Sequence, residues 1–366
     1  MGCLMPKIFS DNRRKRLTET EPQKTYSWSN RDRSQASKFI IENQSKSLLL
    51  RSPGEINGEQ FIIQNCFDSI ICLFDYSNTV TIDDCRDCVF FIGPVMGSVV
   101  LRNCQDCKLS SASQQFRCRD CKRLKLYLSC ATQPAIESCT AMLFSCFVAN
   151  YNGLKELFLK ANLKIFNNKW FNVYDFSIGD QEKNWSIDTS TKIDQCFDSL
   201  PKTFIEGLTF DPLHSLIPRT YGIASLNDLK FSNQNEDGQQ NCIILVYCYS
   251  KDSSRIDDQV YRLIKEIKLN IEQSKLLATK LITNHLINSI NGIVRDNDFK
   301  LQIQGSDGSM IVPNHLIVLL YDGHLIIEEL SEICRNFLDA DIKSKILLQN
   351  YNEKIFNDCL ALIFEN

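Results

Sequence analysis

The chain has 366 residues, a formal net charge of −3 and 43% hydrophobic residues, which describes a globular protein with room for two domains. The slight acidic balance gives no support for nucleic-acid binding by the whole chain. No run of 18 apolar residues occurs, so the sequence predicts no membrane-spanning helix. We expect the 17 cysteines to be reduced thiols in the cytosol, because no export signal precedes them.

Residues 1–50 are expected to form a tail rather than a domain. Gly2 becomes the acceptor for N-myristoylation once Met1 is removed, and Cys3 beside it is a natural site for palmitate. A basic cluster at 13–16 follows. A second acyl chain or a basic patch makes the attachment of a myristoylated protein to a membrane durable. Pro6 departs from the motif, which has Ser or Thr there, so a chance Gly2 in an ordinary tail is the alternative.

A repeat fills residues 61–147. Each copy is marked by an Asn, Asp or Ser followed by Cys, and the steps between successive copies are 19, 19, 17 and 18 residues. The markers are Asn65-Cys66, Asp84-Cys85, Asn103-Cys104, Asp120-Cys121 and Ser138-Cys139. Apolar and polar columns alternate around the cysteine, which is the period of a strand with one buried face. Short strands stacked at this spacing predict a parallel β-helix with a ladder of buried cysteines.

Two cysteine pairs have the spacing of a four-cysteine zinc site. They are Cys85-x-x-Cys88 and Cys104-x-x-Cys107. Other copies place Ser69, Leu124 and Met142 in the second column, which favours buried side chains over thiolate ligands. We therefore expect no metal site, with zinc as the alternative.

Two outward columns hold the candidate binding residues. The column two residues before the cysteine contains Gln64, Asp83, Arg102, Arg119 and Glu137. The column four residues before it contains Ile62, Thr81, Val100, Arg117 and Ala135. A single guanidinium, that of Arg117, within an exposed apolar stripe favours a partner surface. The alternative is an ordinary solvated Arg117 paired with Glu137 one coil further on.

The coils are expected to end near residue 150, and the segment that follows to cover the open sheet edge. We place the β-helix domain with this capping segment at 51–231 and a polar linker at 232–240. Beyond it, at 241–366, buried strand patterns alternate with helical stripes, which predicts a smaller α/β or α+β domain. No glycine-rich phosphate loop is recognisable there.

The run 114–121, Gln-Gln-Phe-Arg-Cys-Arg-Asp-Cys, resembles the signature of the tubulin-binding cofactor C domain. The segments 91–95, 97–99 and 131–134 resemble the same family. The resemblance covers about residues 1–190 and is thin beyond 240. It implies a right-handed parallel β-helix, followed by a ferredoxin-like α+β domain similar to nucleoside diphosphate kinase, although no kinase histidine motif accompanies it.

The resemblance also implies a GTPase-activating protein for an Arf-like small G protein, acting in ciliary protein transport. Arg117 matches the arginine finger, and Gln114 and Gln115 match its neighbours at the nucleotide. Glu137 matches the acid that orients the arginine. GTP and Mg²⁺ would be bound by the partner, so we expect no cofactor in this chain. As an enzyme activator, it is expected to turn over no substrate of its own.

Further contact residues are expected around the finger. They are Val100, Arg119 and, after the capping segment, an exposed Asp175 and Phe176. The acylated tail predicts a location on the cytoplasmic face of a membrane, and the resemblance implies that this is the plasma or ciliary membrane, at the cilium or basal body. One alternative is a tubulin-folding cofactor that acts on the tubulin GTPase. Another is a scaffold that binds the G protein without stimulating it.

Overall fold

The computed structural model describes most of the first domain and the main elements of the second. The described residues are 37–177, 183–188, 205–212, 214–222, 240–248, 254–271, 275–282, 290, 303–304, 310–311, 313, 315–323, 327–338 and 342–348. The tail with Gly2 and Cys3, and most of the linker at 232–240, lie outside these residues.

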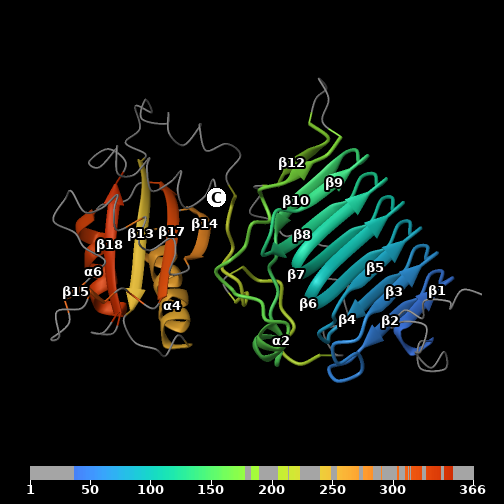
Figure 1. Cartoon of the computed structure of the whole chain (residues 1–366), viewed down its shortest axis with the longest axis horizontal. Helices are drawn as coiled ribbons and strands as arrows, with labels where there is room; N and C mark the ends of the chain where they lie inside the picture. The colour runs from blue at the N-terminus through green and yellow to red at the C-terminus, as the bar shows by residue number, and fades with distance from the viewer. Residues whose placement is uncertain are drawn as a thin grey trace, which may run out of the picture. The chain divides into compact units, whose positions relative to one another are not determined.

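The first domain is a parallel β-helix whose coils stack along its axis (Figure 1). Its strands are β1 (Ile40–Glu42), β2 (Leu48–Arg51), β3 (Phe61–Gln64), β4 (Ile70–Leu73), β5 (Val80–Asp83), β6 (Val89–Arg102), β7 (Lys108–Arg119), β8 (Lys125–Cys130), β9 (Ala135–Glu137) and β10 (Met142–Cys146). Every pairing between them is parallel. The parallel β-helix predicted from the repeat is therefore confirmed.

The register of the strands reproduces the columns of the repeat. Val80 pairs with Val99, and Val99 pairs with Phe116, so these apolar side chains stack inside the coil, where all three are buried. β6 and β7 are long enough to take part in two stacks, the first through their N-terminal halves and the second through their C-terminal halves.

A left-handed backbone conformation explains the small polar residue before each cysteine. The φ angles at these corners are 53° at Asn65, 53° at Asp84, 50° at Asn103, 54° at Asp120 and 52° at Ser138. Asn and Asp tolerate this conformation because their short side chains can hydrogen-bond locally. The marker dipeptides therefore lie at the corners where the chain turns from one strand to the next.

The cysteine ladder lies inside the corners, as predicted. Cys66, Cys85, Cys104, Cys121 and Cys139 are all buried. Each thiol donates a hydrogen bond, 3.2 or 3.3 Å long, to the backbone carbonyl two residues earlier. Each cysteine therefore fills a small apolar space and also satisfies a carbonyl of its own corner.

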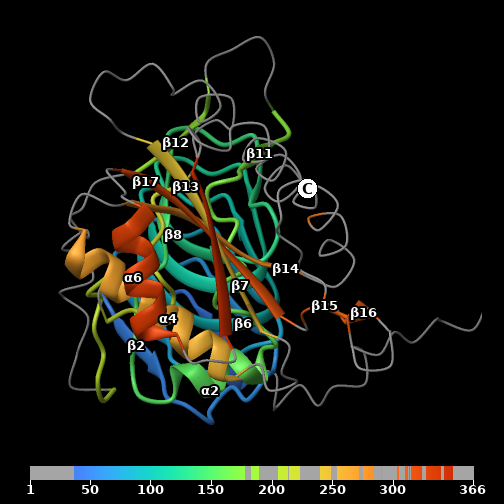
Figure 2. The same cartoon turned by 90° about the vertical axis from the view of Figure 1, so that its left-hand side faces the viewer.

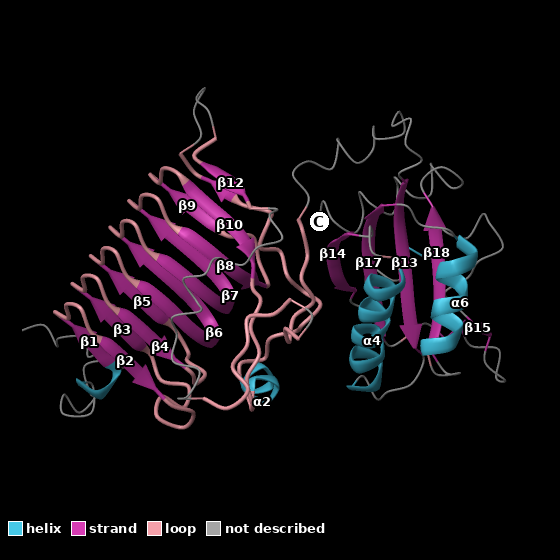
Figure 3. Cartoon of the chain, turned by 180° about the vertical axis from the view of Figure 1, so that it is seen from behind, coloured by secondary structure: helices cyan, strands magenta, loops and turns pink. Residues whose placement is uncertain are grey.

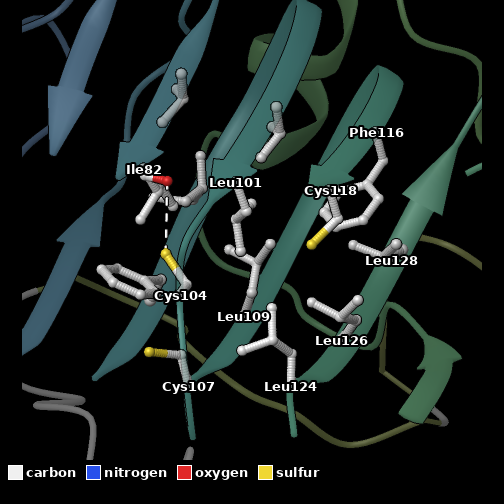
Figure 4. Packing of buried hydrophobic residues seen from close by; sticks show 14 of the residues in the cluster. Ile82, Leu101, Cys104, Cys107, Leu109, Phe116, Cys118, Leu124, Leu126 and Leu128 are labelled. Atoms are coloured by element: carbon white, nitrogen blue, oxygen red, sulfur yellow. Dashed lines mark hydrogen bonds between the residues drawn. The ribbon is translucent and has the colours of Figure 1, made fainter. Parts of the chain in front are cut away.

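Figure 4 shows the packing around the ladder in the middle coils. The Cys104 thiol also lies 3.5 Å from the carbonyl oxygen of Ile82 in the coil before, while Leu101, Leu109 and Phe116 fill the space between the sheets. The outward residues are thus carried by strands whose opposite face is fully packed.

The solenoid begins one coil earlier than the sequence predicts. β1 pairs with β3, and β2 pairs with β4, so the boundary at residue 50 between tail and β-helix is wrong. The first coil escapes the pattern because Gln44 replaces the cysteine of the marker, although Asn43 before it keeps the left-handed φ of 56°.

The segment after residue 150 first packs across the side of several coils, from β4 to β8, and then extends the stack at its open edge. The helix α2 (Leu154–Lys160) buries Leu154, Leu157 and Phe158, which belong to the cluster that contains Phe91 and Phe147. Two short strands, β11 (Tyr174–Asp175) and β12 (Trp185–Ile187), then pair with β9 and β10. They extend the stack by part of a coil at its open edge, as Figure 3 shows from behind.

The second domain contains one four-stranded antiparallel sheet among its described residues. Its elements are β13 (Gln240–Cys248), α4 (Ser254–Asn270), β14 (Lys275–Ile282), β17 (His315–Gly323), α6 (Ile327–Phe337) and β18 (Ile342–Leu348), with a small hairpin of β15 (Ile303–Gln304) and β16 (Met310–Ile311). The strand order is β14-β17-β13-β18, and α4 and α6 lie on one face of the sheet (Figures 2 and 3).

With the β15–β16 hairpin set aside, the elements follow the order β-α-β-β-α-β, which is the order that the ferredoxin-like prediction requires. The apolar side chains of Ile244, Val246, Ile317 and Leu319 pack in one cluster with Val260 of α4. The likeness to nucleoside diphosphate kinase stays a prediction.

Candidate functional site

The candidate site lies on the outward face of β7. Gln115, Arg117 and Arg119 alternate with the buried Phe116 and Cys118. An extended strand sends successive side chains to opposite faces, so all three polar side chains point away from the packed core.

Arg117 has neutral neighbours in both adjacent coils. In the register of the sheet, Val100 stands beside it on β6 and Ala135 beside it on β9. These are the neighbours that the sequence columns predict. Neither side chain can pair with a guanidinium, so the charge of Arg117 is not neutralised within its column.

Gln115 provides the hydrogen bond that Arg117 makes among the described residues. The Nη2 atom of Arg117 donates to the side-chain oxygen Oε1 of Gln115 over 3.2 Å. The same oxygen accepts a hydrogen bond of 3.3 Å from the hydroxyl of Ser98. The column pattern predicts Arg117 and the family resemblance predicts Gln115, whereas neither gives Ser98 a role.

Glu137 contacts Arg119 rather than Arg117. The two residues pair in register between β7 and β9, and the Nε atom of Arg119 lies 3.9 Å from Oε2 of Glu137 and 3.2 Å from Oδ2 of Asp120. One rung away, Arg102 is bound to Asp83, with its Nε atom 2.8 Å from Oδ1. The pairing of Arg117 with Glu137, considered in the sequence analysis, is therefore replaced by an Arg119–Glu137 contact.

A surface groove of about 690 Å³ surrounds Arg117. Its lining combines the apolar side chains of Val100 and Ala135 with polar groups of Gln115, Gln133 and Glu137. Phe176 lies at its edge, with 67% of its surface exposed. Arg102 and Arg119 also line the groove, and each contacts a carboxylate, whereas Arg117, among the described residues, does not. A groove with apolar lining and one unneutralised cation is suited to an anionic group presented by another molecule.

Asp175 does not belong to the exposed surface. It pairs in register with Ile136, an inward position of the repeat, and it is buried. Its carboxylate accepts hydrogen bonds from the backbone N–H of Ser177 (2.8 Å) and from the Asn184 amide (3.1 Å). The prediction of an exposed partner contact is wrong here, because the capping strand continues the alternation of the coils and turns Asp175 inward.

The two residues that flank Asp175 do face outward. Tyr174 is 52% exposed and stands beside Ala135, in the column of Arg117. Its ring meets that of Phe176 edge to face, with 4.7 Å between the centroids. The predicted exposure of Phe176 is confirmed, and Tyr174 is an aromatic neighbour that the sequence analysis missed.

Gln114 is exposed next to Gln115 on β7, and its backbone is held in place. Its carbonyl oxygen accepts hydrogen bonds from the N–H and the hydroxyl of Thr132, both 3.1 Å long. Its side chain is thus carried on a fixed part of β7, next to Gln115.

The disulfide-free cysteines whose side chains the structure describes are all buried. Burial raises the pKa of Cys72 to about 12 and that of Cys130 to about 11, so both thiols stay protonated at neutral pH. Among the described residues, no group of three or more His, Cys, Asp or Glu side chains is placed to hold a metal ion. In the same part of the chain, no helix is long and apolar enough to span a membrane.

The fold and the groove define a β-helix domain of the cofactor C class. The sequence profile described as "Tubulin binding cofactor C" matches residues 58–176, which contain the groove and Arg117. Among solved structures, "Tubulin Binding Cofactor C from Leishmania major" is 26% identical, covers 31% of this chain and 79% of that chain, and has a TM-score of 0.28.

Curated relatives extend the similarity into the second domain. Protein XRP2 of Homo sapiens is 39% identical over 253 residues, which are 68% of this chain and 69% of the relative. Protein XRP2 of Mus musculus is 35% identical over 329 residues, which are 87% of this chain and 90% of the relative. The chain therefore belongs to the Protein XRP2 family and carries a tubulin binding cofactor C domain.

Proposed function

We propose that the chain is a GTPase-activating protein that inserts Arg117 as an arginine finger into the GTP-bound form of an Arf-like small G protein. The observation that carries the proposal is the isolation of one guanidinium. Arg117 is the outward arginine of β7 whose two rung neighbours are neutral, so its charge is available to a partner.

Phosphoryl transfer needs stabilisation of charge on the γ-phosphate more than it needs covalent chemistry. A guanidinium supplies permanently charged donors in a planar fork that matches phosphate oxygens. The β-helix holds Arg117 on a strand with a packed opposite face, so little backbone rearrangement is needed on binding. In this proposal the partner binds GTP and Mg²⁺, and this chain contributes no cofactor.

The other predicted residues take supporting roles. Gln115 holds the guanidinium through Oε1, and the exposed Gln114 precedes it on the same strand. Glu137 acts on the finger indirectly, because its carboxylate neutralises Arg119, the nearest competing cation on the same strand. Val100 and Phe176 would exclude water around the transferred phosphate.

The test is single-turnover GTP hydrolysis by purified Arf-like G proteins, with and without this chain. An arginine finger supplied in trans typically raises the rate about 10³- to 10⁵-fold. Stimulation in this range that disappears with Arg117→Ala supports the proposal. Tight binding of the GTP-bound partner without stimulation would instead indicate the scaffold.

A role on the tubulin GTPase is the second candidate, and the matched profile is named for it. The same assay with tubulin in place of the G protein distinguishes the two. If this chain stimulates GTP hydrolysis by tubulin but not by any Arf-like protein, Arg117 would be assigned as an arginine finger for tubulin.

Membrane attachment is proposed from Gly2, Cys3 and the basic cluster at 13–16, which would place the chain at the plasma or ciliary membrane. Gly2→Ala should release the protein to the cytosol, whereas Cys3→Ser should leave weaker, reversible attachment, because one acyl chain binds only marginally. Fractionation of cells that express each variant measures this. Full membrane retention of the Gly2→Ala protein would contradict the proposal.

A further inference from the structure

A bulge in β6 places Ser98 opposite Gln115. Along β6 and β7 the partners are Val95 with Ser113 and then Ser98 with Gln115, so β6 contains one residue more than β7 over this stretch. Gly97 lies within the bulge, where a Cβ atom would come within 2.8 Å of the carbonyl oxygen of Asn78. Such bulges often re-aim a side chain next to a functional site.

The hydroxyl of Ser98 and the guanidinium of Arg117 share one acceptor. Ser98 Oγ lies 3.3 Å and Arg117 Nη2 lies 3.2 Å from Oε1 of Gln115. An amide oxygen has two lone pairs, so both donors can be satisfied at once. With both donors on Oε1, the amide is held in one of its two orientations, and its NH₂ end is left to donate to another group.

We propose that Ser98 is a positioning residue for the arginine finger, acting through Gln115. This inference rests on the proposed GTPase activation and assigns one further residue a role in it. Arg117 and Gln115 both have several rotatable bonds and lie at the surface. Ser98 has a short side chain and lies on β6, beside Gln115. Its hydrogen bond fixes the Gln115 amide relative to the sheet and thereby restricts the positions of the guanidinium before the partner binds.

The expected effect of Ser98→Ala is on rate rather than on affinity. Loss of the hydroxyl allows the Gln115 side-chain amide to rotate by about 180°, which weakens its hydrogen bond with Arg117. We expect the maximal rate of stimulated hydrolysis to fall by about tenfold, the worth of one hydrogen bond in the reactive geometry. The chain concentration for half-maximal stimulation should change by less than about twofold, because Ser98 is not among the residues that line the groove around Arg117.

Two variants control for structural effects. Ser98→Thr keeps the hydroxyl and suits a strand, so it should restore most of the rate. Thr79→Ala removes a hydroxyl one coil earlier at the same position of the repeat, where the hydroxyl bonds Asn78 instead of Gln115; it should behave like the unchanged protein. An equal loss in Ser98→Thr or in Thr79→Ala would overturn the inference.

A double-mutant cycle tests the route through Gln115. In a Gln115→Ala background, Ser98→Ala should cause no further loss of rate, because its only proposed route of action is already removed. A further tenfold loss in that background would overturn the inference, as would an unchanged rate in the Ser98→Ala single variant.

A measurement on the free chain separates this inference from the proposed function. The side-chain NH₂ signals of Gln115 can be assigned in ¹⁵N NMR spectra by their absence in Gln115→Ala. Ser98→Ala should shift and broaden these signals, whereas Thr79→Ala should leave them unchanged. If no Arf-like protein is stimulated, the proposed function fails, but the spectra still decide whether Ser98 positions Gln115: unchanged signals in Ser98→Ala would refute it.

Discussion

Two arginines on one strand face have different electrostatic surroundings. Arg119 stands between Arg102 and Glu137 in its column, and it contacts the carboxylates of Glu137 and Asp120. Arg117 stands two residues earlier, between Val100 and Ala135, and bonds only a neutral amide among the described residues. Both are exposed. The difference shows that whether an exposed arginine is neutralised depends on the residues beside it in the adjacent coils and not on its exposure alone.

The largest expected effect comes from removing the isolated charge. Arg117→Ala should reduce stimulated GTP hydrolysis by about 10³-fold or more, because the transition-state charge loses its donor. Much of the affinity for the GTP-bound partner should remain. Single-turnover hydrolysis and a binding titration measure the two quantities separately.

Lysine at position 117 is the matched control. It keeps the charge but not the planar fork, so Arg117→Lys should restore little of the rate. Normal stimulation by the Arg117→Ala protein would contradict the arginine-finger assignment.

A second change makes the column of Arg117 resemble that of Arg119. Val100→Asp places a carboxylate about 5 Å away on the adjacent rung, where it can pair with the guanidinium. The rate of stimulated hydrolysis should fall by about tenfold or more, because the new carboxylate pairs with the guanidinium and also repels the negatively charged phosphate that the finger must bind. Thr81→Asp, one rung further from Arg117, serves as the control and should have a much smaller effect.

The capping strand offers a comparison between two adjacent residues. Phe176→Ala should weaken binding of the partner by about tenfold, since a large exposed ring would be buried on contact. It should leave the melting temperature unchanged. Asp175→Ala should instead lower the melting temperature, because two hydrogen bonds to the buried carboxylate are lost. If Asp175→Ala instead weakens binding of the partner and leaves the melting temperature unchanged, Asp175 is a contact residue and not a structural one.

The smallest effect is expected for Arg119. Exposed ion pairs contribute between 0 and about 1 kcal/mol, so Arg119→Ala should lower the free energy of unfolding by less than about 1 kcal/mol and reduce activity only slightly. Urea denaturation monitored by circular dichroism measures the first quantity. A loss of stimulation as large as that of Arg117→Ala would remove the distinction between the two columns.

The repeat allowed the inward and outward columns to be predicted because a parallel β-helix stacks equivalent residues directly on one another. Val100, Arg117 and Ala135 could be aligned by counting from the cysteine, and the structure pairs them in that way. The first coil was missed because Gln44 takes the place of the cysteine.

Counting failed where the repeat itself is interrupted. Asp175 follows a long insertion after the last marker, so its inward position could not be obtained by alignment. Ser98 does stand six residues before Cys104, as Gln115 does before Cys121. A contact between two flexible polar side chains, however, depends on rotamers that a residue pattern does not contain.

The equivalence of the stacked corners has a consequence for how this family can change length. Each corner residue from Asn65 to Asp120 donates its backbone N–H to a carbonyl of the next coil in the same way, so one whole coil is a unit that can be gained or lost. A coil inserted before Val80 would lengthen the domain by about 4.8 Å and leave the environment of Arg117 intact. A coil inserted between Val100 and Arg117 would separate Ser98 from Gln115. We therefore expect natural length variation at the N-terminal end of the solenoid and a constant spacing from Ser98 to Arg117.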